Sequence, residues 1–258
     1  MALPSGSFAW ARFSRLWPLH CVVLCFTAFM LRSDADTNAY NFLMSLGLLH
    51  VFLPDIDVLN PPVWSISVEF ICYAIFAGMA LRFGKHFFII GSACLAILGG
   101  ILVYGETLTP IGRGLLGFFI GCLIHLHQEQ LRALPLAVLV IGCTMFALVE
   151  NTFAGLVLVA TVGWSSLILL APRLSFLQAQ PVQWLGSRSY AIYLVHLPLF
   201  IFFGNLRLMA PEFPVILGVS ICFGFTFLVA DILYRNLEMP AQNYLRKVAI
   251  RPGGASAA

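Results

Sequence analysis

The sequence predicts an all-α fold: a polytopic integral membrane helical bundle of about eight transmembrane helices, with one further interfacial or re-entrant helix. Two observations, the amino-acid composition and the mean hydropathy, support this prediction first. Of the 258 residues, 60% are hydrophobic and 10% charged, whereas an ordinary soluble domain is roughly 45–50% apolar and about 25% charged. The mean hydropathy is +0.94. This composition excludes a soluble globule, a disordered chain and a nucleic-acid binder.

The third observation is the length of the apolar stretches. A transmembrane helix needs about 20 mostly apolar residues. Eight stretches qualify, some of them short: residues 14–31, 63–81, 86–104, 111–127, 133–149, 153–171, 188–205 and 214–234. The run 41–52 is apolar but too short to cross, which favours an interfacial or re-entrant helix. Nothing indicates a second domain, so we expect one membrane domain over residues 1–258 with a tail at 241–258.

Lysine and arginine are distributed unevenly between the two sides that these spans define. Cytoplasmic loops carry an excess of both residues. If the sides alternate, one side holds 11 of the 14: Arg12, Arg15, Arg82, Lys85, Arg132, Arg173, Arg188, Arg235, Arg246, Lys247 and Arg251. The other side holds Arg32, Arg113 and Arg207. Both termini, including the tail, are therefore expected in the cytoplasm.

No metal or bound cofactor is expected. The seven cysteines lie inside apolar runs, without a C-x-x-C pair or a histidine at zinc spacing. They are interpreted as small apolar packing residues.

Glu69 is the clearest ionisable residue inside a predicted span. Such a group is costly in lipid and usually faces the interior of the protein or a water-filled cavity. Ser65, Glu69 and Tyr73 follow one another at four-residue spacing, which places hydroxyl, carboxylate and phenol on one helical stripe. The spacing leaves two interpretations open: a functional carboxylate, or a buried one satisfied by its neighbours.

Two further groups have both a structural and a functional interpretation, and a third, Asp231, has a structural one only. Tyr193 and His196 share a helical face, but a histidine there is more often a packing residue. Asp231 precedes Arg235 by four residues, which predicts a local ion pair. Arg12 and Arg15 share a face at the cytoplasmic end of the first span, where they are membrane anchors or a phosphate-binding pair.

Four runs together carry a resemblance to a known family. They are RFSRLWP at 12–18, PVWSISVE at 62–69, GSRSYAIYLVHLP at 186–198 and YRNLEMP at 234–240. Their order and spacing resemble those of acyltransferase family 3, integral membrane enzymes that transfer an acyl group, usually acetyl from acetyl-CoA, to saccharides of the cell envelope or exported glycans.

The resemblance implies roles for particular residues. Glu69 matches the motif glutamate and would be catalytic, and Arg12 and Arg15 would bind the phosphates of the donor. Trp64 and Ser65 would bind the saccharide acceptor, while Tyr193 and His196 lie in a motif of unassigned role. Acetyl-CoA or another acyl-CoA would be a co-substrate, and the remaining partner would be membrane lipid. The implied location is a bacterial inner membrane. The sequence does not indicate an oligomeric state.

The resemblance begins at the family's third span. The eight predicted spans would then correspond to the third to tenth, and the chain is expected to be N-terminally truncated relative to the family, without the catalytic histidine of the first span. His20 and His50 match no catalytic position of the family. Two alternatives therefore stay open: a catalytically inactive partner subunit, and a polytopic transporter or flippase that uses Glu69 as a coupling carboxylate.

Overall fold

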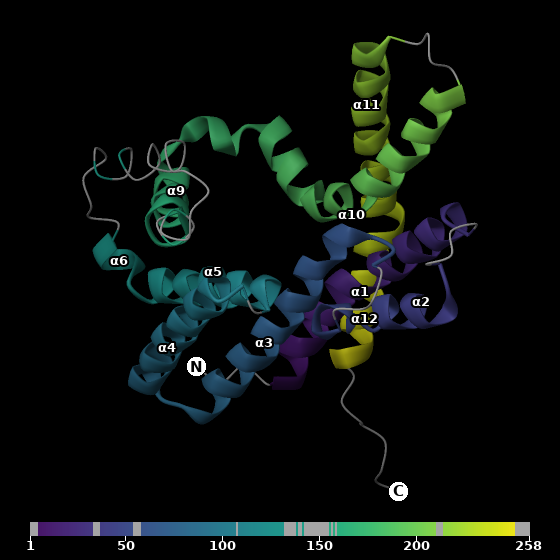
Figure 1. The fold of residues 1–258 in the computed structure, drawn as a ribbon. Helices are drawn as coiled ribbons and strands as arrows, with labels where there is room; N and C mark the ends of the chain where they lie inside the picture. Colours follow the sequence, from purple (N-terminus) through teal and green to yellow (C-terminus); the bar gives the residue numbers. More distant parts are fainter. Residues whose placement is uncertain are drawn as a thin grey trace, which may run out of the picture. The chain divides into compact units, whose positions relative to one another are not determined.

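The computed structural model describes residues 5–32, 37–53, 58–106, 108–131, 159–209 and 214–250, with single positions at 138, 141, 155 and 157. Every regular element in these ranges is a helix (Figure 1), which confirms the all-α class. Six helices are long and apolar enough to cross a membrane: Phe8–Met30, Pro61–Arg82, Lys85–Tyr104, Thr109–Leu126, Gln180–Leu206 and Val215–Lys247. The protein is therefore polytopic and membrane-integral.

These six helices correspond to six of the eight predicted spans. The predicted span 133–149 lies outside the described residues, apart from two isolated positions, and the span 153–171 is described continuously only from residue 159. The short segment 41–52 forms helix α2 (Ala39–Leu46) and the 3₁₀ turn η1 (His50–Phe52), and neither is long enough to span. Its place at the membrane interface stays a prediction.

The described helices divide into two compact units. The first contains the chain up to Ser67 and from Leu185 onward, and the second contains Val68–Trp184. The elements of the first are α1 (Ser5–Met30), α2, η1, η2 (Pro61–Val63), the start of α3 (Trp64–Arg82), most of α10 (Gln180–Met209), α11 (Val215–Leu233), the π-helical turn η6 (Tyr234–Glu238) and α12 (Met239–Ile250).

Hydrogen bonds between distant residues hold the first unit together. The indole of Trp10 on α1 donates to the carbonyl of Leu245 on α12, at 2.6 Å. The Tyr190 hydroxyl on α10 donates to the Leu16 carbonyl on α1, at 2.5 Å. The predicted tail therefore begins as helix α12, packed against α1 (Figure 1).

Helix α10 begins eight residues earlier than the predicted span at 188. The proline and the polar residues of QPVQWLG are typical of a loop. Pro181 is, however, the second residue of the helix, where its missing N–H has no intrahelical partner to lose and its fixed φ suits the helix.

The second unit begins within α3 and contains α4 (Lys85–Tyr104) and α5 (Thr109–Leu126), which lie side by side (Figure 1). Its remaining elements are α6 (Gln128–Leu131), the π-helical turn η3 (Val159–Gly163), α9 (Trp164–Leu170) and the 3₁₀ turns η4 (Ala171–Arg173) and η5 (Ser175–Gln178). Phe119 is fully buried in this unit.

Glycine lets α4 and α5 approach closely. A Cβ at Gly99 would lie 2.5 Å from the backbone nitrogen of Leu116 and 2.6 Å from the carbonyl oxygen of Gly112. Small residues at such a contact are typical of membrane helices, whose association depends on close packing of the backbones.

Gly99→Ala is therefore expected to lower the free energy of unfolding by about 1–3 kcal/mol, because backbone must move to admit the methyl group. Gly100→Ala is the matched control, since no atom outside its own helix lies within 4 Å of the added carbon. Thermal unfolding of the two variants in detergent measures the difference. Equal midpoints would show that the α4–α5 contact tolerates a side chain.

Candidate functional site

The two arginines of the RFSRLWP run differ in their surroundings. The guanidinium of Arg12 lies 5.3 Å from the centre of the Phe8 ring and is half-buried. Arg15 is exposed and interacts electrostatically with Glu238, the last residue of η6. The first and last of the four family-like runs thus meet within the first unit.

Glu238 is a residue that sequence reasoning missed. Its side chain is only 5% exposed, and its Oε2 has no hydrogen-bond partner among the described residues. The signal was present, because YRNLEMP places an acidic residue just beyond an apolar span. A buried carboxylate with a spare acceptor is suited to hold a guanidinium in a fixed position.

The predicted ion pair between Asp231 and Arg235 is confirmed, with Arg235 Nε 2.8 Å from Asp231 Oδ2. The structure adds a second arginine: Arg188 Nε donates to Asp231 Oδ1 at 2.7 Å, and its guanidinium lies over the ring of Tyr234. Asp231 therefore joins α10 to the end of α11. Arg188 was not foreseen because it lies 43 residues away.

Ser65 and Tyr193 form a small hydrogen-bonded group. The Tyr193 hydroxyl donates to the carbonyl of Pro62 at 2.6 Å, and the Ser65 hydroxyl donates to Tyr193 at 2.9 Å. This group ties α10 to the start of α3. Trp64, the other predicted acceptor residue, is half-buried next to Ser65.

His196 is held by its own helix. Its Nδ1 lies 2.7 Å from the carbonyl oxygen of Tyr193, which can only accept, so Nδ1 carries the hydrogen. The ring also packs edge-on against Phe200. These contacts agree with a packing role.

Glu69 has a partner on the same helix. Tyr73 donates its hydroxyl hydrogen to Glu69 Oε1, as the four-residue spacing implied. The Tyr73 ring packs edge-on against Phe118 of α5, which orients the phenol. The half-buried carboxylate is therefore held by Tyr73 through one of its two oxygens.

The first unit also buries two histidines that the sequence analysis did not assign to the site. His20 on α1 is fully buried, and its Nε2 lies 3.0 Å from the carbonyl oxygen of Ser45 on α2. His50 in η1 is 5% exposed, and its Nε2 lies 3.3 Å from the Ser67 hydroxyl on α3. The signal was the position of His20 well inside a span, where a polar ring needs partners.

Burial changes the pKa of the His50 imidazole. Loss of hydration lowers the pKa of His50 to about 4, and the nearby His20 adds to the lowering. His50 is therefore neutral at physiological pH.

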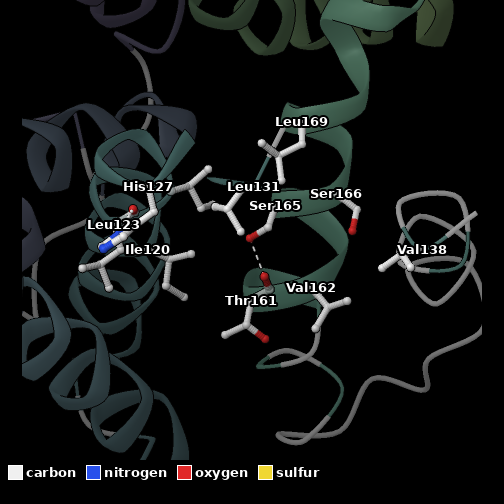
Figure 2. A pocket seen from close by; sticks show the side chains of 11 residues that line it. Ile120, Leu123, His127, Leu131, Val138, Thr161, Val162, Ser165, Ser166 and Leu169 are labelled. Atoms are coloured by element: carbon white, nitrogen blue, oxygen red, sulfur yellow. Dashed lines mark hydrogen bonds between the residues drawn. The ribbon is translucent and has the colours of Figure 1, made fainter. Parts of the chain in front are cut away.

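A cavity of about 450 Å³ lies in the second unit, between α5 and the η3–α9 segment (Figure 2). Three of its polar side chains are bonded to their own helices: His127 to the Leu123 carbonyl at 2.9 Å, Thr161 to the Val157 carbonyl at 2.7 Å, and Ser165 to the Thr161 carbonyl; Ser166 is the fourth polar residue of the lining. The rest of the lining consists of aliphatic side chains. None of the predicted site residues lines this cavity.

No group of three histidine, cysteine, aspartate or glutamate side chains that could hold a metal ion occurs in the part of the chain that the structure describes.

Six membrane-length helices, with one arginine near a buried glutamate and with two buried imidazoles, define a polytopic integral membrane protein. The family model described as an acyltransferase domain matches residues 3–235, and the chain belongs to this family of acyltransferases. No curated protein matches the chain, and no solved structure does.

Proposed function

We propose that the protein is a membrane O-acyltransferase that moves an acetyl group from cytoplasmic acetyl-CoA to a hydroxyl group of a cell-envelope or exported saccharide. The observation that carries the proposal is the arginine pair Arg12 and Arg15 on a membrane-length helix of a chain that belongs to an acyltransferase family. Guanidinium groups bind phosphate oxygens in pairs, and CoA carries several phosphate groups.

The reaction needs one nucleophile, one leaving group and one proton transfer. The acceptor oxygen attacks the thioester carbonyl carbon, the carbon–sulfur bond breaks, and the hydroxyl proton passes through a base to the departing thiolate. A sugar hydroxyl is a poor nucleophile at neutral pH, so a base within hydrogen-bond reach is required. Glu69, oriented by Tyr73, is proposed to bind the acceptor hydroxyl or to orient that base.

The proposed acceptor contacts are Trp64 and Ser65, at the start of the helix that carries Glu69. An indole ring offers a flat apolar face to a sugar. We propose that both termini are cytoplasmic, because 11 of the 14 basic residues fall on the side of the termini. The family to which the chain belongs supports a bacterial inner membrane as the location.

The test supplies acetyl-CoA, radiolabelled in the acetyl group, to inside-out membrane vesicles that contain the full chain. Alkali-labile label is expected in the saccharide fraction, and vesicles from cells lacking the chain give the background. Background-level transfer by a correctly inserted chain would contradict the proposal and favour the inactive partner subunit.

In the same vesicles, Glu69→Gln is expected to lower acetyl transfer by about an order of magnitude or more, because it removes the charge and keeps the shape. Glu129→Gln, an exposed glutamate on α6, is the control. The amount of inserted protein is measured in each case. Full activity of the Glu69→Gln enzyme would make the Glu69 carboxylate structural.

A further inference from the structure

A cavity of about 430 Å³ lies in the first unit, between α1, α10 and α11. Its volume is in the range of ligand pockets, about 300–1,000 Å³. Every residue of its lining is apolar, and each helix contributes side chains at four-residue spacing, which places them on one helical face. The lining includes Val22 and Phe26 on α1, Val195 and Leu199 on α10, and Val229 and Leu233 on α11. This cavity is called the apolar groove.

The apolar groove opens at the surface of membrane-length helices. Phe26 on α1 and Phe225 on α11 are exposed, whereas Val195 and Leu199 on α10 are buried. All three helices are long and apolar enough to cross the membrane. The surroundings of a side chain exposed on such a helix are lipid tails, because the hydrocarbon core of a bilayer contains no water. An acyl chain can therefore enter the groove from the bilayer.

Proline contributes to the lining without adding a polar atom to it. Pro198, inside α10, is a fully buried residue of the groove. Since proline has no N–H, the carbonyl four residues earlier, that of Leu194, loses its helical partner. The side-chain amide of Asn60 replaces that partner and donates to the Leu194 carbonyl at 3.1 Å. The carbonyl is thus satisfied within the protein, and the apolar lining suits an acyl chain better than water, which needs polar partners.

An apolar lining alone does not select one lipid from a bilayer. Lipid tails are as apolar as leucine, so a chain that moves from the bilayer into the groove gains contacts but no hydrophobic free energy. Selection therefore requires a polar group of the protein that recognises the lipid headgroup.

Guanidinium groups lie close to one end of the groove along the helices. Arg235 follows the groove residue Leu233 by two positions, and Arg188 precedes Leu199 by about three helical turns on the same face of α10. Both arginines contact the single carboxylate of Asp231, at 2.7 and 2.8 Å. Two guanidinium groups and one carboxylate have a net positive charge, and the side chain of Arg235 is 63% exposed. This end of the groove is therefore suited to an anion.

We propose that the apolar groove and the Arg188–Asp231–Arg235 cluster together bind one anionic glycerophospholipid of the cytoplasmic leaflet. One acyl chain occupies the groove, and the phosphate group pairs with the exposed guanidinium of Arg235, because the planar guanidinium matches the geometry of phosphate oxygens. Basic pockets between transmembrane helices on the cytoplasmic side bind such headgroups. None of the proposed donor or acceptor residues lines the groove, so the inference stands without the proposed acyl transfer.

Native mass spectrometry of the full chain in detergent tests the role of the headgroup. The probes are phosphatidylglycerol and phosphatidylcholine with identical palmitoyl and oleoyl chains. Wild type is expected to bind phosphatidylglycerol about fivefold more tightly, since one basic residue near a headgroup contributes about 1 kcal/mol, or a factor of about five. Arg235→Gln is expected to abolish this preference and to leave phosphatidylcholine binding unchanged. Arg113→Gln, an exposed arginine on α5, is the control.

A second variant tests the groove itself. Val229→Trp fills part of the groove and is expected to weaken the binding of both lipids at least fivefold. Val219→Trp, at an exposed position of α11 outside the groove, is expected to leave both unchanged. Thermal unfolding of each variant in the same detergent measures whether it is folded.

Four results would overturn the inference. Equal affinity of wild type for the two lipids would show that the headgroup is not recognised, and unchanged binding by folded Val229→Trp would place the lipid elsewhere. Displacement of phosphatidylglycerol by an equal concentration of glycerol phosphate would show recognition of a free phosphate. A dimer that excludes lipid and that Val229→Trp dissociates would assign the groove to a second copy of the chain.

Discussion

The double variant Arg12→Lys and Arg15→Lys is expected to insert normally but to show a KM for acetyl-CoA raised about ten- to a hundredfold. Lysine satisfies the positive-inside rule as well as arginine does. It offers a point charge, however, in place of a planar fork that pairs with two phosphate oxygens. Loss of one charge-assisted hydrogen bond costs about 1.5–3 kcal/mol, and about 1.4 kcal/mol corresponds to a factor of ten in affinity.

The structure refines this expectation for the two positions. Arg15 is exposed and close enough to Glu238 to interact with it electrostatically, so its guanidinium is accessible, whereas Arg12 is half-buried over Phe8. Arg15→Lys alone is therefore expected to account for most of the rise. Arg82→Lys, at the exposed end of α3, tests whether any such substitution has this effect. An unchanged KM in the double variant would identify the arginines as membrane anchors.

Acidification is expected to destabilise the folded chain through His50. The unfolded chain takes up a proton on this ring near pH 6.5, and the folded chain only near pH 4, because burial lowers the pKa. Protons therefore favour the unfolded state. The stability contributed by neutral His50 is fully present above pH 6.5 and is lost as the pH falls toward 4, a change of about 3 kcal/mol.

Thermal unfolding in detergent between pH 7 and pH 4 measures this effect. Carboxylates titrate in the same range, so the informative quantity is the difference between variants. His50→Gln is expected to lose less stability than wild type, and the exposed His86→Gln to lose as much as wild type. Parallel curves for all three proteins would show that the folded chain protonates His50 as readily as the unfolded chain does.

The parts of the fold that could be predicted are those determined within one helix. Apolar length alone located six membrane helices, because the thickness of the bilayer sets how many residues a span needs. The four-residue spacing likewise predicted the Asp231–Arg235 ion pair and the alignment of Glu69 with Tyr73. These inferences need only the geometry of a single helix.

The pairs of candidate-site residues that the sequence did not predict lie on different helices, so predicting them requires knowing which helices are neighbours. Helical spacing does not reveal that Glu238 lies near Arg15, or that His20 of α1 lies near His50 of η1. In a membrane protein every span has an apolar surface, so hydrophobicity gives little information about pairing. The family-like runs therefore identified several important segments without showing which of them meet.

The discontinuity of the first unit has a consequence for biosynthesis. Residues 68–184 emerge from the ribosome between its two halves, which takes on the order of ten seconds at roughly 5–20 residues per second. During that interval Asn60, whose amide later donates to the Leu194 carbonyl, is already synthesised while α10 is not. The Asn60–Leu194 hydrogen bond therefore forms only after the whole second unit has been synthesised, and the continuous second unit can pack before the first is complete.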